Sequence, residues 1–343
     1  MDGNKVRNME EFAMLSGISR PTLSKYFHDP ESVRASTRDR IEKALTEHDY
    51  RPNIFAMNQN RRTTNNIGIV VPFLGDPFFA EIARNLEKRC IEAGYSPILF
   101  SAHGDPALEV DILESLRSQK PAGVLLAPLG RASDRKHIEK FAADIPTVLF
   151  DSGIPDMGAA FVGMDNTQSM RMLVSYLCNS GSPPNFLEMR TAVNPNVNRR
   201  RNAYVSAMEA LGHMPEVVRI DGEGWEFEEI GLQGGLSAFA TGRFTSDTIL
   251  CSNDRLAIGL LSAAYRSKLT VGRGNDSDLR IAGHDDHPFS RFTCPALTTV
   301  SQDYASISEK SLEILFKLMN SEKRGEYASD CLFDGILIPR ASA

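Results

Sequence analysis

The sequence predicts an N-terminal all-α helix-turn-helix unit with a hinge, followed by an α/β core of two doubly wound parallel-sheet lobes. Three observations predict this architecture. The chain has 343 residues, which exceeds the length that a single hydrophobic core usually stabilises. Its first 50 residues hold three short amphipathic segments, and from Ile67 onward short apolar runs alternate with amphipathic segments.

The composition is that of an ordinary globular chain, with 42% hydrophobic and 24% charged residues. No apolar run reaches the roughly 18 residues of a membrane span, and the first residues lack a signal-type apolar stretch. We therefore expect a cytoplasmic protein without a membrane anchor. Its five cysteines are scattered and form no CxxC pair, which predicts free thiols and no disulfide framework or zinc site.

The net charge of −6 is unevenly distributed along the chain. Residues 1–62 carry 11 Lys and Arg against 9 Asp and Glu, whereas the remainder carries 27 against 35. The acidity therefore belongs to the large unit. Any attraction to DNA would come from local clusters in the small unit.

Three short helices are expected in the first 50 residues. Asn8, with Glu11 three positions later, is typical of a helix N-terminus, and Ser16–Ile18 ends this first helix. Ser19 can cap a second helix with Pro21 in its first turn, where the missing N–H costs little. A third helix opens at 36–39. A glycine-containing turn between the first two helices is typical of a helix-turn-helix unit.

A polar stretch at 51–66 separates this unit from the rest of the chain. It contains Pro52 and the pair Arg61 and Arg62, and it is expected to be a linker that forms one or two helical turns when supported. The expected units are therefore 1–50, 51–66 and 67–343.

The remainder alternates short apolar strands with helices. Strands are expected at 67–71, 97–100, 123–127, 147–150, 186–189, 217–220, 248–251, 279–282 and 297–300. Helices are expected at 78–93, 108–118, 135–142, 166–179, 199–211, 227–240, 256–269 and 304–319. This alternation of strands and helices implies parallel sheets that are covered by helices on both faces. About ten strands fit two lobes, each with its own sheet, better than one sheet.

Six blocks, in order, carry a likeness to a known family: SGISRPTLSKYFHDPESVRASTRDRIEKAL, HDYRPN, IGIVVPFLGDPFFAEI, VLFD, SNDRLAIGLLSA and IAGHDDHPFSRFTCPALTTVSQD. The sequence resembles the LacI/GalR family of bacterial transcription regulators over almost its whole length. The resemblance implies a DNA-binding headpiece, a hinge helix and a core similar to periplasmic sugar-binding proteins. It also implies three crossings between lobes, with lobe one at about 67–162 plus 292–322 and lobe two at 163–291 plus 323–343.

The resemblance also implies which residues contact DNA. The family's base-reading positions fall on Arg20, Pro21 and Lys25, and Arg or Lys can donate to guanine in the major groove. Residues expected to position the helix through phosphates are Thr22, Ser24, His28 and Arg34.

The family's hinge contacts the minor groove, and its positions fall on Tyr50, Asn53 and Ala56. Gln59 stands where the family usually places a wedging leucine. Either another apolar residue, such as Phe55 or Met57, does the wedging, or this protein bends its operator less.

Polar side chains follow the strand ends, where ligands bind in open α/β sheets. These residues are Asp76, Phe78, Asp151, Asn253, Asp254 and Asp285. Carboxylates and an amide can form paired hydrogen bonds with adjacent hydroxyls, which indicates a polyhydroxyl ligand. The resemblance adds Trp225 as a stacking ring and Arg200, which lies in the run NRRRNAY between the alternatives Arg199 and Arg201. Gln302, which follows the strand at 297–300, is a further candidate. Ala127 stands where some relatives have a polar contact, so the ligand can differ from theirs.

The run at 284–287 contains two histidines and two aspartates, which are possible metal ligands. Adjacent residues on one loop rarely converge on one ion, so no metal is expected. The chain contains no G-x-S-x-G, HExxH, Walker A or strand-linked GxGxxG motif, so neither catalytic residues nor a cofactor are expected.

We therefore expect a repressor whose affinity for double-stranded operator DNA is controlled by a sugar-like effector. A homodimer is expected, with each headpiece on one half of a pseudo-palindrome, and no heptad tail for a coiled-coil tetramer follows Ile338–Arg340. The alternatives are a carbohydrate-binding protein without a role in transcription and an enzyme acting on a small polar substrate. Both leave the helix-turn-helix unit unexplained.

Overall fold

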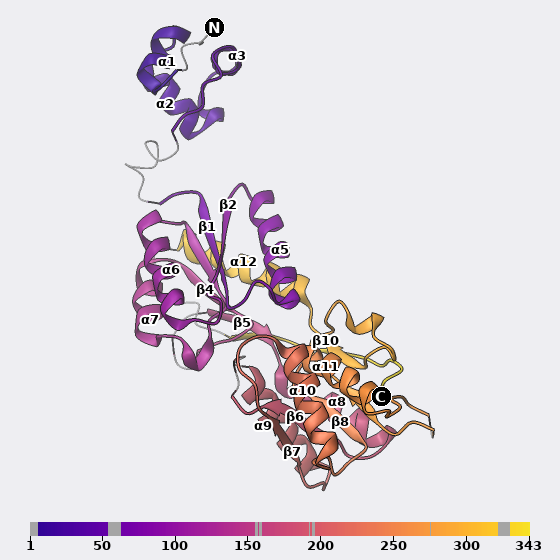
Figure 1. The fold of residues 1–343 in the computed structure, drawn as a ribbon. Coiled ribbons are helices and arrows are strands. Elements are labelled where there is room, and N and C mark those ends of the chain that lie inside the picture. The colour runs from indigo at the N-terminus through magenta and orange to yellow at the C-terminus, as the bar shows by residue number, and fades with distance from the viewer. Residues whose placement is uncertain are drawn as a thin grey trace. The chain divides into compact units, whose positions relative to one another are not determined.

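The computed structural model describes residues 6–53, 63–154, 157, 160–191, 193, 196–274, 276–321 and 330–343. The chain forms two compact units, residues 1–64 and residues 65–343 (Figure 1).

The small unit packs three helices, α1 (Met9–Ser16), α2 (Arg20–His28) and α3 (Ala35–Glu47), with the short 3-10 helix η1 (Pro30–Ser32) between the last two. Both expected caps are confirmed. The side chain of Asn8 accepts hydrogen bonds from the N–H groups of Glu10 and Glu11, and that of Ser19 accepts from Thr22. The buried core consists of Phe12, Ile18, Leu23, Val33, Ile41, Ala44 and Tyr50.

The large unit begins with a six-stranded parallel sheet in the order β11-β5-β4-β3-β1-β2. Its strands are β1 (Asn66–Val71), β2 (Ser96–Ser101), β3 (Gly123–Leu126), β4 (Thr147–Phe150), β5 (Ala160–Met164) and β11 (Asp330–Phe333). The helices that cover it are α5 (Pro77–Glu92), α6 (Pro106–Gln119), α7 (Arg135–Asp144) and α12 (Tyr304–Asn320).

The central strands β1, β3, β4 and β5 are buried on both faces of this sheet, which explains their continuous apolar sequences. Ile69 packs in the same core as α5 and α12, whereas its neighbour Val70 packs in a second core with α6 and α7. This alternation follows from the two-residue period of side chains along a strand.

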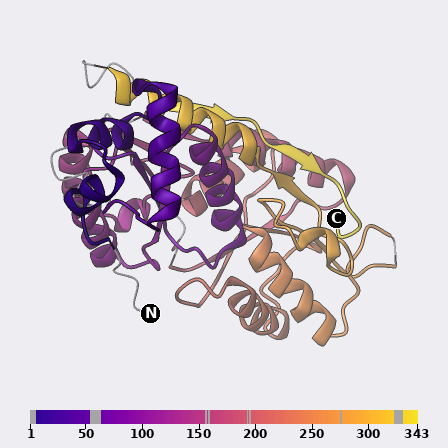
Figure 2. The ribbon, with the colours of Figure 1, turned by 90° about the horizontal axis from the view of Figure 1, so that it is seen from above.

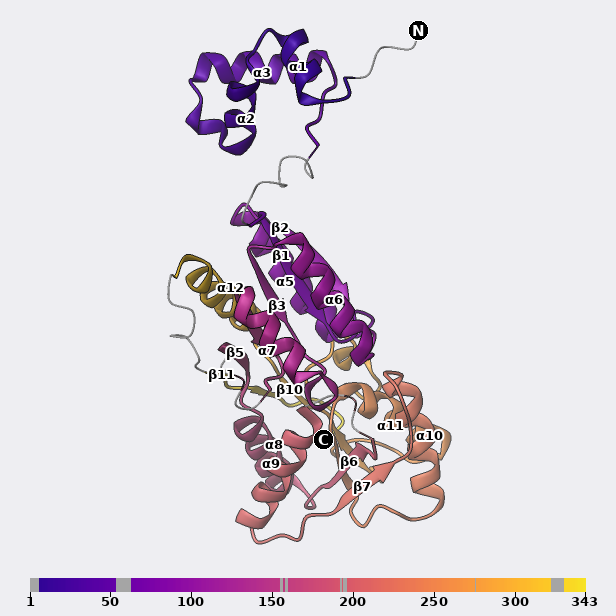
Figure 3. The same cartoon turned by 90° about the vertical axis from the view of Figure 1, so that its left-hand side faces the viewer.

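The second lobe holds a four-stranded parallel sheet in the order β7-β6-β8-β9. Its strands are β6 (Asn185–Met189), β7 (Val217–Ile220), β8 (Thr248–Cys251) and β9 (Arg280–Ala282). Figure 3 shows α8 (Asn166–Ser180) and α9 (Asn196–Ala210) on one side of it, and α10 (Phe227–Ala240) and α11 (Asp254–Arg266) on the other. The two lobes expected from the alternating pattern are thus confirmed.

Two lobe boundaries differ from those expected. β10 (Thr299–Ser301) pairs with β12 (Ile336–Ile338), and a bridge between Ala282 and Thr298 joins this segment to the second sheet. The chain therefore returns to the first lobe at α12 and not at residue 292. β11 pairs with β5 in the first sheet, although residues from 323 onward were expected in the second lobe. In Figure 2 the yellow C-terminal strands run from the first lobe to the second.

Among the described residues, no helix combines the length and apolar character that a membrane crossing requires. All five cysteines carry free thiols, as the sequence predicted.

Candidate functional site

One cavity lies between the two lobes and collects eight of the nine residues that were expected to bind a ligand. Its lining residues are Asp76, Phe78, Phe79, Asp151, Arg200, Asn253, Asp254, Arg255, Asp285, His287 and Gln302. The carboxyl ends of both parallel sheets supply them, which is where ligands bind in such folds. The free volume is about 20 Å³, room for roughly one water molecule.

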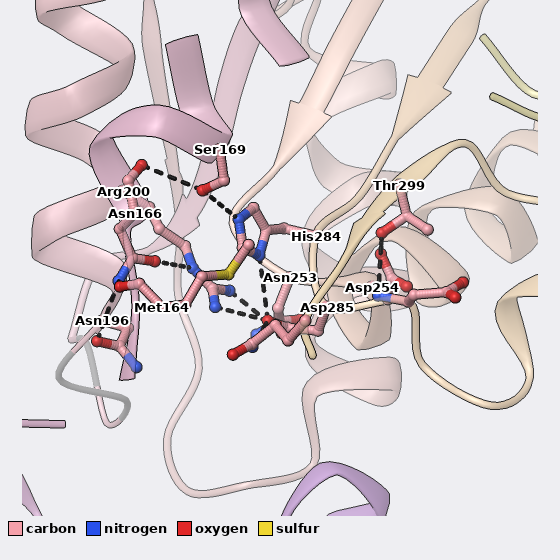
Figure 4. A network of polar contacts seen from close by, with 12 residues as sticks. Met164, Asn166, Ser169, Asn196, Arg200, Asn253, Asp254, His284, Asp285 and Thr299 are labelled. Carbon is pink, nitrogen blue, oxygen red and sulfur yellow. Dashed lines mark hydrogen bonds and ion pairs between the residues drawn. The ribbon is translucent and has the colours of Figure 1, made fainter. Parts of the chain in front are cut away.

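Arg200 and Asp285 form the central ion pair of the cavity (Figure 4). Arg200 comes from α9 and is only 2% exposed. Its Nη2 and Nη1 donate to the two carboxylate oxygens of Asp285 at 2.5 and 3.1 Å. Further bonds to the carbonyl of Ser252 (2.8 Å) and to Oδ1 of Asn166 (3.0 Å) fix the guanidinium in a bidentate geometry.

Asp285 is held in its ionised form. Burial opposes ionisation, but the charge of Arg200 and hydrogen bonds from His284 and Arg200 outweigh it and keep the pKa of Asp285 well below its ordinary value. Burial lowers the pKa of His284 to about 4, so this ring is neutral near pH 7. Its Nδ1–H then donates to Asp285 (3.1 Å), and its Nε2 accepts from the hydroxyl of Ser169 (3.0 Å).

The backbone around these carboxylates is strained. Asp285 has a φ of 115° and Asp151 a φ of 59°, values that residues with a side chain rarely adopt. Such strain costs on the order of 1–3 kcal/mol per residue and is concentrated at functional sites. Gln302 supports the strained loop by donating to Oδ1 of Asp285 at 2.8 Å.

Asp151 offers the cavity an unused acceptor. Nδ2 of Asn196 donates to its Oδ1 at 3.0 Å, but its buried Oδ2 has no hydrogen-bond partner in the described part of the chain. Burial raises the pKa of Asp151 to about 7. A carboxyl group of this kind can donate to a ligand hydroxyl or accept from one, depending on its protonation.

Asp254 and Asn253 have their oxygens engaged within the protein. Asp254 accepts from the N–H of His287 and from the hydroxyls of Ser290 and Thr299, at 2.6 to 2.8 Å, and so ties two loops together. Oδ1 of Asn253 caps α11 by accepting from the N–H of Leu256 at 2.8 Å. Both line the cavity, but the contacts of Asp254 indicate a mainly structural role.

Sequence reasoning missed Phe79, Arg255 and His287, which also line the cavity. Nη1 of Arg255 donates to Oδ2 of Asp76 at 3.1 Å and so links the lobes. The sequence does contain an indication that Arg255 lies at the site: it directly follows the predicted site residues Asn253 and Asp254, in the first turn of a helix.

Trp225 is the one expected ligand residue that does not line the cavity. Its ring is 6% exposed and stacks on Phe73 of the first lobe, with centroids 5.4 Å apart and an interplanar angle of 14°. The expected ligand-stacking face is therefore covered by another side chain in this conformation.

The run His284–His287 does not converge on one point. Asp286 pairs with Arg340, and Nδ1 of His287 accepts from the N–H of Phe289 at 3.1 Å. Within the described ranges, no group of three or more His, Cys, Asp and Glu side chains is arranged to hold a metal ion.

Most of the expected DNA-contacting residues lie on the surface of the small unit. The exposed ones are Arg20, Pro21, Ser24, Lys25, His28, Arg34 and Asn53. Thr22 is half-buried, with its hydroxyl 2.8 Å from that of Ser19. Tyr50, by contrast, is 6% exposed and stacks on Phe12 with centroids 4.4 Å apart, so its ring belongs to the core. Ala56 and Gln59 lie outside the described residues.

Two protein-family models match this chain, one in each unit. The model of the periplasmic binding protein domain matches residues 67–323, and that of the bacterial regulatory proteins of the lacI family matches residues 8–53. The ribose operon repressor of Escherichia coli strain K12 is 24% identical over 308 residues, which cover 90% of this chain and 91% of the relative.

Two solved structures show the same fold. The lac repressor dimer bound to operator and the anti-inducer ONPF aligns with a TM-score of 0.84 and 21% identity, over 98% of this chain and 99% of that chain. A periplasmic binding protein/LacI transcriptional regulator from Alkaliphilus metalliredigens QYMF, complexed with D-xylulofuranose, aligns with a TM-score of 0.69 and 22% identity, over 81% of this chain and 99% of that chain.

Proposed function

Because the chain belongs to the lacI family of bacterial regulatory proteins, we propose that a small polyhydroxylated molecule, a carbohydrate or a close relative, binds between its lobes. The protein is a ligand-responsive transcription regulator that binds DNA sequence-specifically. The proposed ligand acts as the effector that changes operator affinity, and the proposal gives the cavity a binding role and no catalytic one.

The convergence of carboxylates and a fixed guanidinium in one cavity carries this proposal. Asp285 and Arg200 present a charged acceptor and donor side by side, and Asp151 adds an acceptor without a partner in the described part of the chain. Adjacent hydroxyls of a sugar match such pairs. The carbohydrate in the structure of the Alkaliphilus relative supports the same ligand class.

On the DNA side, we propose that α2 enters the major groove and that Arg20 and Lys25 read base edges. The helix presents both cations on its exposed surface, and the lac repressor in the aligned structure is bound to its operator. By analogy with that dimer, two copies of this chain bind the two halves of one operator, in the cytoplasm. The hinge proposed for 51–66 includes residues outside those described.

A thermal-shift screen of the full chain against sugars, sugar alcohols, sugar phosphates and nucleobases tests the effector proposal. A ligand at 100 times its Kd stabilises the native state by about 2.7 kcal/mol and so raises the Tm. We expect a carbohydrate hit that Asp285→Asn abolishes. Asp286→Asn, the matched control, should retain it because that carboxylate pairs with Arg340 and does not line the cavity. A nucleobase as the only hit would contradict the proposal.

A further inference from the structure

Trp225 is enclosed by aromatic rings from both lobes. It lies between β7 and α10 in the second lobe, and its ring stacks on Phe73, which follows β1 in the first lobe. The rings of Phe79 and Phe227 contact it at steep angles, with centroids 6.0 and 5.6 Å away. Stacked and edge-to-face aromatic pairs stabilise a contact beyond the area that they bury.

The first lobe is shaped to receive the indole. Gly104 follows β2 with a φ of +74°, and a Cβ atom placed on it would lie 2.6 Å from Nε1 of Trp225. A side chain at position 104 would therefore push the indole away. Glycine here serves both the left-handed backbone and the close approach of the second lobe.

A buried ion pair links the lobes beside these rings. Arg255 on α11 donates to Asp76 of the first lobe at 3.1 Å, and both side chains are about nine-tenths buried. The guanidinium also makes two bonds to Glu228, at 2.7 and 2.6 Å, and lies 5.0 Å from the ring centroid of Phe227. Phe227 therefore contacts both Arg255 and Trp225, so the aromatic and ionic contacts form one continuous cluster.

We propose that Trp225 with Phe73 and Arg255 with Asp76 form an interlobe latch, which stabilises the closed arrangement of the two lobes. The cavity that Asp76 and Arg255 line has room for roughly one water molecule, so an effector enters only when the lobes separate. The latch thus sets the balance between closed and open forms on which effector binding acts. Its contacts involve only side chains of this chain, so a failure of the latch and a failure of the carbohydrate proposal are distinguishable.

Trp225 is the only tryptophan in the chain, so its fluorescence reports on the latch directly. We would measure acrylamide quenching and the small-angle scattering radius of the full chain without effector or DNA. Gly104→Ala should raise the quenching constant about twofold or more and enlarge the radius, because the population shifts to the open form. Gly94→Ala is the matched control, since Gly94 has a similar φ of +80° and nothing within 4 Å of its added Cβ.

Asp76→Asn provides a second test that is independent of the indole contact. Asparagine retains the N-cap of α5 but loses the charge that pairs with Arg255. If the ion pair and the stacked rings act together, Asp76→Asn should raise both the acrylamide quenching constant and the scattering radius. A higher quenching constant and a larger radius in both Gly104→Ala and Asp76→Asn, with wild-type values in Gly94→Ala, would support the latch. Unchanged values in both, or increased quenching with an unchanged radius, would overturn it.

Discussion

Arg200 is the residue on which the charge balance of the cavity depends. It is almost wholly buried, and its guanidinium neutralises Asp285 while bonding to Ser252 and Asn166. Removal of one partner from a buried ion pair leaves the other charge without solvent or counter-charge, which is far costlier than loss of a surface pair.

Arg200→Ala should therefore lower the free energy of unfolding by about 3–5 kcal/mol. Arg199→Ala is the control, because that side chain is partly exposed; it donates to the carbonyl of Gly153 at 3.1 Å and lies 5.5 Å from the ring centroid of Phe161. It should cost about 1 kcal/mol. Urea unfolding of the two variants measures the difference, and equal losses would contradict the central position assigned to Arg200.

Asp151 should make stability depend on pH. Burial raises its pKa from 3.8 to about 7, so between these values the folded protein holds a proton that the unfolded chain has released. This contribution to the free energy of unfolding is therefore present at low pH and is lost as pH rises through about 7. One unit of pKa difference corresponds to about 1.4 kcal/mol.

Asp151→Asn removes this titration and keeps an oxygen for Asn196. Between about pH 5 and 7.5, wild type should lose at least about 1 kcal/mol more stability than the variant. Contributions from Asp254, whose pKa burial also raises, and from His284, whose pKa burial lowers, cancel in the comparison. Identical pH profiles in urea unfolding would show that Asp151 is already ionised in the folded state.

Residue types at strand ends were enough to predict most of this cavity, because parallel strands bring their carboxyl ends to one edge. The position of Trp225 was not predictable in the same way. Its partner Phe73 lies on the other lobe, far away in the sequence, and only the packed fold brings the two rings together.

Among the elements, α2 carries the proposed DNA readout. Its Ser19 cap and Pro21 in the first turn fix where the helix begins, and Leu23 anchors it in the core, so Arg20 and Lys25 project outward. The helix dipole places its positive end beside Arg20, which favours the approach of phosphates.

Arg20→Ala should reduce discrimination between a selected operator and its single-base variants by roughly 1–3 kcal/mol, as expected for one lost bidentate base contact. Lys43→Ala removes an exposed cation from α3 and serves as the control. Operators chosen from a random duplex pool and titrated at fixed salt provide the measurement. Unchanged discrimination in Arg20→Ala would remove Arg20 from the set of base-reading residues.

The helices were predictable from periodicity and caps, and α10 begins and ends at the expected residues. Three strands, β5, β11 and β12, were missed. β11 pairs with a strand more than 160 residues earlier, so its local sequence carries little signal of its partner. The same distant pairing explains why the last lobe boundaries were misplaced.

At the scale of the whole molecule, the proposed function joins the two units by one regulatory relation, in which occupancy of the cavity changes affinity for DNA. Coupling of this kind typically amounts to about 1–3 kcal/mol and acts reciprocally on both ligands. Under the proposed latch, the effector shifts a balance between closed and open lobes.

Titration of a fluorescent operator duplex at fixed salt, with and without the saturating carbohydrate identified by thermal shift, tests this relation most directly. The affinity for the operator should rise or fall by about 5- to 150-fold when the carbohydrate is present, and Asp285→Asn should abolish this change. The same affinity with and without the bound carbohydrate would contradict the account, because the cavity would then have no influence on DNA binding.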